Sequence, residues 1–294
     1  MGCGSRMDWP QGVILMLRQR VITGVSMAAA FLAAIAYLPV AALAAVFAVV
    51  VCLGGWEWAR LAGFSSPIAR AGYSLLLLAA MAGLYIYCGL DGEPVREQVQ
   101  PFLGLACLWW SFALLWVKSY PASATLWTSL VMRSVMGVLI LVSAWLAAVF
   151  LLSFTRGGLL MVAMILIVVT ADVGAYFTGK SFGRHPLASK VSPAKTWEGF
   201  WGGMACVLAL ALIMYYLLPG QSLSLSLTAV VVIALVTALS SVVGDLTVSM
   251  VKRESGLKDS GSLLPGHGGL LDRLDSICGA APVFALGLLL AGYR

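Results

Sequence analysis

The chain has 294 residues, of which 61% are hydrophobic and only 10% are charged. A soluble globular protein is nearer half apolar and a quarter charged, so this composition excludes a soluble protein and places the chain in a lipid bilayer. The net charge of +6 does not indicate nucleic acid as a partner, because the basic residues are spread over the segments between apolar runs, as membrane topology requires.

Apolar segments follow one another along the whole chain. Each is about 17 to 22 residues long, which is the length that an α-helix needs to cross the hydrocarbon layer. We therefore predict an all-α, polytopic integral membrane protein with about nine transmembrane helices. The predicted spans cover residues 21–38, 40–60, 71–90, 101–117, 134–154, 159–178, 200–218, 226–247 and 277–292.

These spans divide the chain into three parts. Residues 1–20 form a predicted cytoplasmic tail, and residues 21–154 form a transmembrane scaffold. Residues 155–294 form a transmembrane catalytic region with two long polar loops, 179–199 and 248–276. Seven of the twelve acidic residues and both histidines lie in this last part. We therefore expect the chemistry there and regard the first half as mostly scaffold.

The distribution of positive charge predicts the orientation. When the N-terminus is placed in the cytoplasm, all of the eighteen Lys and Arg residues except Arg96, Arg156 and Arg294 fall on the cytoplasmic side. Cytoplasmic loops of membrane proteins carry the excess of Lys and Arg. Both polar loops are thus predicted to face the cytoplasm. We expect a multi-pass protein of the cell inner membrane whose active site faces the cytoplasm.

The most informative polar segment is residues 244–276, GDLTVSMVKRESGLKDSGSLLPGHGGLLDRLDS. Asp245 is predicted at the end of the eighth span. Asp272 and Asp275 open the ninth span and share a helix face, because they are three residues apart. A carboxylate near the membrane needs a partner, and three carboxylates from two helix ends suit a hard divalent cation such as Mg²⁺. The alternative is an acidic pair that only favours a helix N-terminus.

Basic and glycine residues lie between these acids. Lys252, Arg253 and Lys258 either form salt bridges or hold phosphates. The run Pro265-Gly266-His267-Gly268-Gly269 allows a close backbone approach and leaves N–H groups for anions. We expect His267 to position or hydrogen-bond a substrate, because a phosphate nucleophile is already anionic and needs no base.

The second polar segment is residues 171–199, ADVGAYFTGKSFGRHPLASKVSPAKTWEG. Asp172 lies in an apolar run, and a charge there marks a site unless it is internally paired. Ser192 followed by proline predicts a helix N-cap and first turn that would aim at an anion, with Lys190 and Lys195 close by. Trp197 is interpreted as an interfacial anchor or as a surface on which a base stacks.

Taken together, these runs resemble a known family. The run SMVKRESGLKDSGSLLPGHGGLLDRLD resembles the signature of phosphatidate cytidylyltransferases, also called CDP-diacylglycerol synthases. The runs ADVGAY and KVSPAKTWEG and the start RVIT at residues 20–23 are similar to other segments of that family, so the resemblance covers nearly the whole chain. One departure is Val248, where many relatives are expected to carry an acidic residue.

The resemblance implies a reaction and a set of site residues. The phosphate of phosphatidate would attack the α-phosphorus of CTP, pyrophosphate would leave, and Mg²⁺ would assist; a second cation is compatible with this site. The implied catalytic residues are Asp245, Lys258, Asp259, His267, Asp272 and Asp275, with Asp245, Asp272 and Asp275 as metal ligands and Asp172 as a further candidate. The implied phosphate-binding residues are Lys190, Ser192, Lys195, Lys252, Arg253, Gly268, Gly269 and Arg273.

The expected partners are CTP, phosphatidate and the lipid bilayer, with a homodimer as a further expectation. Two other functions remain open at this stage. A CTP-dependent polyprenol kinase would handle phosphate similarly, but we would not expect it to carry the whole signature run. A transporter would distribute its carboxylates across the spans, often in two repeated halves.

Overall fold

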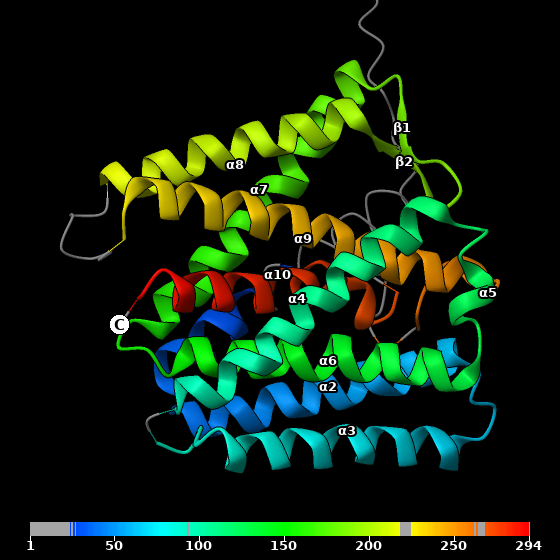
Figure 1. Cartoon of the computed structure of the whole chain (residues 1–294), viewed down its shortest axis with the longest axis horizontal. Coiled ribbons are helices and arrows are strands. Elements are labelled where there is room, and N and C mark those ends of the chain that lie inside the picture. Colours follow the sequence, from blue (N-terminus) through cyan, green and yellow to red (C-terminus); the bar gives the residue numbers. More distant parts are fainter. Residues whose placement is uncertain are drawn as a thin grey trace, which may run out of the picture.

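A computed structural model of the chain describes Gly24, Ser26 and residues 28–92, 94–217, 225–261, 263 and 268–293. Within these residues, eight helices are long and apolar enough to cross a membrane. They form one packed bundle, shown in Figure 1. The eight helices are α2 (Val40–Ala62), α3 (Pro67–Tyr87), α4 (Arg96–Ser119), α6 (Leu130–Leu152), α7 (Gly157–Phe182), α8 (Trp197–Leu217), α9 (Leu227–Glu254) and α10 (Leu271–Leu290).

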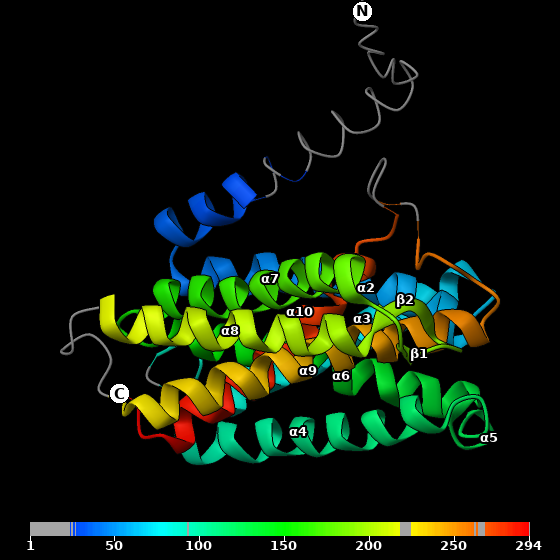
Figure 2. The same cartoon turned by 90° about the horizontal axis from the view of Figure 1, so that it is seen from above.

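The prediction of an all-α membrane protein is confirmed for these eight helices. The predicted first span, 21–38, lies partly outside the described residues, and its described part contains the shorter apolar helix Ala28–Tyr37. This helix lies at the edge of the bundle (Figure 2), with Ile35 beside Gly158 at the start of α7. The structure therefore leaves the count of nine spans as a prediction.

Packing places α6 and α10 at the centre of the bundle. The side chains of α6 are mostly buried, and α6 packs against α2, α3, α4, α7 and α10. In turn, α10 packs against α4, α6 and α9, while α8 packs mainly against α7 and α9. In Figure 1, α3, α2 and α6 lie in the lower half, α10 lies in the middle, and α9 and α8 lie above it. The helices that carry the predicted site thus pack directly on the scaffold helices.

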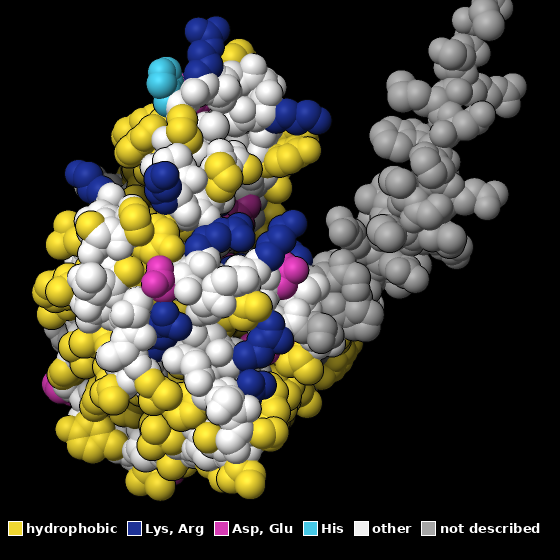
Figure 3. Space-filling model, turned by 90° about the vertical axis from the view of Figure 1, so that its right-hand side faces the viewer, with side chains coloured by type: hydrophobic (Ala, Val, Ile, Leu, Met, Phe, Trp, Pro, Cys, Tyr) yellow, Lys and Arg dark blue, Asp and Glu magenta, His cyan; other side chains and the backbone are white. Residues whose placement is uncertain are grey.

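The connections of the bundle alternate between its two ends. Residues 63–66, 120–129, 183–196 and the described parts of 255–270 lie at the right-hand end in Figure 1, which we call the loop end. The short helix α5 (Ala124–Trp127) is part of this end. Figure 3 looks onto the loop end and shows Lys and Arg side chains gathered there above a yellow hydrophobic body. Both predicted polar loops therefore lie at the same, basic end.

The segment before α8 differs from the prediction. It forms an antiparallel hairpin of β1 (Pro186–Ala188) and β2 (Ser192–Thr196), in which Ala188 pairs with Ser192. Ser192 and Pro193 thus lie in a strand and do not start a helix, so the predicted N-cap is wrong. Proline is tolerated here because each strand of a two-stranded hairpin is an edge strand. The helix starts instead at Trp197.

The end of α9 also differs from the prediction. The helix continues to Glu254, whereas the apolar pattern placed its end at residue 247. Asp245 therefore lies inside the helix and not at its end. The polar last turns remain helical because their charges are paired: Asp245 contacts Lys195, and Lys252 contacts Asp272.

Candidate active site

The crossing of α9 and α10 brings two carboxylates together. At this point Gly244 and Gly279 face each other, and a Cβ on Gly244 would collide with the backbone oxygen of Asp275. Small residues let helix backbones approach closely in this way. Asp245 follows Gly244 in the sequence, and its carboxylate interacts electrostatically with that of Asp275, which is only 7% exposed. The structure thus places Asp245 and Asp275 on either side of the same helix crossing, and their shared role in binding a metal stays a prediction.

Further charged side chains reach this pair from two other elements. Lys195 on β2 forms an ion pair with Asp245 Oδ2, and Ser249 Oγ donates to Asp245 Oδ1 at 3.2 Å. Asp172 on α7 interacts electrostatically with both Lys195 and Asp245. Three carboxylates and one lysine, from α7, β2, α9 and α10, thus form one electrostatically connected cluster.

Asp272 lies in a separate network. Its Oδ1 accepts from Lys252 Nζ at 2.7 Å, and its Oδ2 accepts from the backbone N–H groups of Ser260 and Gly269 at 2.9 and 3.0 Å. The expectation that the N–H of Gly269 is left for an anion is therefore wrong, because Asp272 accepts it. Gly268 has φ +81°, and a Cβ there would lie 3.1 Å from Asp272 Oδ2. The Asp272 carboxylate thus packs against Gly268 and accepts a hydrogen bond from Gly269.

The oxygen donors fit a hard cation in part. The charge of Asp245 disfavours charge on Asp275, a repulsion that Mg²⁺ would relieve, and carboxylate oxygens are suitable ligands for this cation. In the described part of the chain, however, no three Asp, Glu, His or Cys side chains are arranged as a ready metal site. Asp272 is turned towards Lys252 instead. The assignment of all three aspartates as metal ligands stays a prediction.

The other predicted residues are placed as follows. Arg253 Nε donates to the backbone oxygen of Val191 at 3.2 Å, so this side chain ties α9 to the hairpin. Lys190, Lys258, Asp259 and Arg273 are exposed at the loop end, whereas Ser192 is half-buried in β2. His267 lies outside the described residues. Val248 is fully buried in α9, so in this chain the position is part of the core.

One buried acid was missed by the sequence analysis. Glu57 lies on α2, in the half of the chain interpreted as scaffold, and is only 3% exposed. Its carboxylate accepts from Ser260 Oγ at 2.9 Å and from the backbone N–H groups of Leu270 and Leu271 at 3.1 and 2.9 Å. A signal was present, because a lone acid within an apolar span marks a functional position by default.

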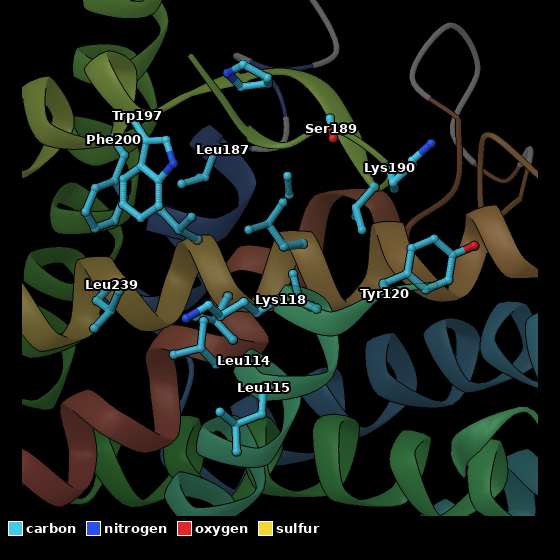
Figure 4. Close-up of a pocket in the computed structure, with 17 residues that line it drawn as sticks. Leu114, Leu115, Lys118, Tyr120, Leu187, Ser189, Lys190, Trp197, Phe200 and Leu239 are labelled. Carbon is cyan, nitrogen blue, oxygen red and sulfur yellow. The ribbon is translucent and has the colours of Figure 1, made fainter. Parts of the chain in front are cut away.

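Two adjoining cavities lie near this site, and Asp172 lines the first of them. One, of about 450 Å³, is lined by Asp172, Lys180, Ser192 and Lys195 among others. The other, of about 530 Å³, lies between the end of α4, the hairpin, α8 and α9. Figure 4 shows the second cavity, with Trp197 and Phe200 at one side and Lys118 at the end of α4. The two cavities share the lining residues Leu187, Phe200 and Val242.

The second cavity continues along the bundle. A third cavity, of about 360 Å³, shares Leu114, Leu239 and Val243 with it and reaches Leu290 near the opposite end of α10. The combined groove between α4 and α9 is therefore apolar along its length and basic at the loop end, where Lys118 and Lys190 lie. Its shape and polarity match an amphiphile with an anionic head.

Comparison with known proteins identifies the family of this chain. The sequence model of the cytidylyltransferase family matches residues 18–291. The phosphatidate cytidylyltransferase of Pseudomonas aeruginosa is 44% identical over 278 residues, which cover 95% of this chain and 99% of that protein. The phosphatidate cytidylyltransferase of Haemophilus influenzae is 38% identical over 285 residues, which cover 92% and 98%. The chain is thus a polytopic membrane protein that belongs to the cytidylyltransferase family.

Proposed function

We propose that the chain is a phosphatidate cytidylyltransferase, which makes CDP-diacylglycerol and pyrophosphate from CTP and phosphatidate. Two relatives that match it over nearly their full length carry that name. The observation that carries the proposal is the charged cluster of Asp172, Lys195, Asp245 and Asp275, in which Asp172 and Lys195 line a cavity that adjoins the apolar groove. The family membership favours nucleotidyl transfer over the kinase and transporter alternatives.

The reaction needs positioning and charge neutralisation more than covalent chemistry. An anionic oxygen of the lipid phosphate attacks the α-phosphorus of CTP. The bond from that phosphorus to the oxygen bridging the β-phosphorus breaks, and pyrophosphate leaves with the bond electrons. No general base is required, because the attacking oxygen is already ionised. The enzyme's contribution is to hold two polyanions in line and to stabilise the charge on the leaving group.

Lysines of the two networks are suited to this task. Lys195 and Lys252 contact Asp245 and Asp272, and charge-assisted hydrogen bonds to phosphate oxygens are stronger than neutral ones. We infer that substrate phosphates compete with the carboxylates for these ammonium groups. We assign the outer phosphates to Lys258 and Arg273, because both are basic and exposed at the same end.

Asp245 and Asp275 are the residues best placed to hold Mg²⁺, and Asp272 would join them by leaving Lys252. When bound, the cation would supply positive charge against the phosphate oxygens as negative charge develops. The chain's own contribution is to hold the two carboxylates together through the close crossing at Gly244 and Gly279.

The cavities suggest where each substrate lies. We place the acyl chains of phosphatidate in the groove between α4 and α9, with the headgroup phosphate near Lys118 and Lys190. The cytidine triphosphate belongs in the more polar cavity beside Asp172 and Lys195. Because Leu187, Phe200 and Val242 line both cavities, the two substrates would lie next to each other in this arrangement. We also infer that the protein lies in the cell inner membrane and that its loop end faces the cytoplasm.

The test uses the full chain, purified in detergent and supplied with labelled CTP, phosphatidate and Mg²⁺. We expect labelled CDP-diacylglycerol and pyrophosphate in equal amounts, and no product when the divalent cation is chelated. A parallel reaction replaces phosphatidate with a polyprenol. Phosphorylated polyprenol without CDP-lipid would show that the chain is a kinase and would overturn the proposal.

A further inference from the structure

Glu57 connects the scaffold to the start of α10 across 213 and 214 residues of sequence. Its Oε1 accepts from the N–H of Leu270, and its Oε2 accepts from the N–H of Leu271. The N-cap position of α10 is Leu270, whose side chain makes no capping hydrogen bond. The first N–H groups of a helix have no partner within the helix and need one from outside. Glu57 therefore caps α10 from another helix.

The same carboxylate holds the segment that precedes α10. Ser260 is fully buried, and its hydroxyl donates to Glu57 Oε2 while its backbone N–H donates to Asp272 Oδ2. Ser260 thus links Glu57 to Asp272 through two hydrogen bonds of 2.9 Å. A displacement of Glu57 would move Ser260 and with it one of the contacts that orient Asp272.

Two glycines of the signature run leave room for this carboxylate. A Cβ on Gly261 would collide with Glu57 Oε1, and a Cβ on Gly269 would lie 2.6 Å from Glu57 Oε2. Both glycines are therefore fitted around a side chain that comes from the other half of the chain. The Glu57 carboxylate thus excludes a side chain at both positions. This steric requirement explains the two glycines without any contact to phosphate.

From these contacts we propose that Glu57 is a positioning residue for the proposed nucleotidyl transfer. It fixes Ser260 and the start of α10, and thereby sets the orientation of Asp272. It does not touch the substrates. The proposal rests on the proposed function for its catalytic consequence, but the contact itself can be tested without turnover.

The first measurement is amide hydrogen exchange on the purified full chain. In Glu57→Gln, an amide NH₂ replaces one acceptor oxygen, so at least one of the three donors loses its partner. We expect faster exchange in peptides that cover residues 257–261 and 268–275, and unchanged exchange in α6. Glu97→Gln is the matched control, because Glu97 is exposed in the first turn of α4, and it should exchange as the wild type does.

The second measurement is turnover per folded protein, judged by a monodisperse elution profile. We expect kcat of Glu57→Gln to fall about ten- to hundredfold, the size expected when a hydrogen bond to a charged group is lost. Ser260→Ala should lower kcat as well. The double variant should lose no more than Glu57→Gln alone, because both single changes break the same link.

The outcomes separate the two proposals. Absence of CDP-lipid in the wild type would refute the proposed function, yet the exchange result would still decide whether Glu57 holds the segment. Unchanged exchange in Glu57→Gln would overturn the inference. Faster exchange with wild-type kcat, or a double variant whose losses multiply, would show that Glu57 only stabilises the fold and does not position Asp272.

Discussion

The close crossing of α9 and α10 predicts a specific effect of Gly244→Ala. A Cβ at this position would collide with the backbone oxygen of Asp275 and lie 3.1 Å from the backbone nitrogen of Gly279. Both neighbours are backbone atoms of a helix, so they cannot turn away as a side chain can. We expect the helices to separate, which would move Asp275 away from Asp245.

The magnitude follows from two opposed terms. Alanine is about 1 kcal/mol better than glycine inside a helix, whereas overpacking a tight contact costs about 1–3 kcal/mol. The net loss of stability should therefore be about 0–2 kcal/mol, and the protein should still fold. Turnover is more sensitive, because a displacement of about 1 Å between reacting groups can cost about a hundredfold in rate.

The assay pairs Gly244→Ala with Gly83→Ala. Gly83 lies within α3, and a Cβ there meets no heavy atom within 4 Å. The control should keep its activity and gain stability slightly. We would measure kcat for CDP-lipid formation and the thermal unfolding midpoint of both variants. Wild-type kcat in Gly244→Ala would refute the idea that this crossing positions the two carboxylates.

Three further predictions concern charge and orientation. Asp272→Asn should abolish turnover and lower the melting temperature, because it leaves the buried Lys252 without its anionic partner. Adding Lys252→Met should restore the melting temperature but not turnover. Lys258→Ala should lower kcat/KM about ten- to hundredfold if it binds phosphate, whereas wild-type kcat/KM would mean an exposed side chain without a role. In a cysteine-free background, an impermeant thiol reagent applied to intact cells should label cysteine at Gly92 but not at Ser181, and the reverse pattern would invert the proposed orientation.

The sequence predicted the helices well because lipid imposes a simple rule on them. A segment that crosses the hydrocarbon layer must satisfy its backbone internally and must be apolar for about 20 residues. The eight described spans obey this rule, and their ends differ from the prediction mainly where charged residues are paired. Lys252 lies beyond the predicted end of α9 but within the helix, where Asp272 neutralises its charge. Apolar patterns cannot reveal such partners, since they lie on other elements.

The sequence indicated which residues form the candidate site better than it indicated how they contact one another. The carboxylates of α9 and α10 and Asp172 were identified because charge is rare in apolar spans. The link from Glu57 to Ser260, by contrast, joins positions 203 residues apart, and no local pattern reports such a distance. The hairpin was also missed, because a serine followed by proline has the same local signature at a helix start and in an edge strand.

The capping of α10 by Glu57 has a consequence for the order in which the helices are inserted and folded. Glu57 enters the membrane with α2, long before Ser260 and Leu270 have been synthesised. A carboxylate at such a position is costly until its donors arrive. A chain that stops after α9 therefore lacks the three donors of Glu57, which come from Ser260, Leu270 and Leu271. Completion of α10 both builds the site and removes this defect, so α2 reaches its final environment only after α10 has been synthesised.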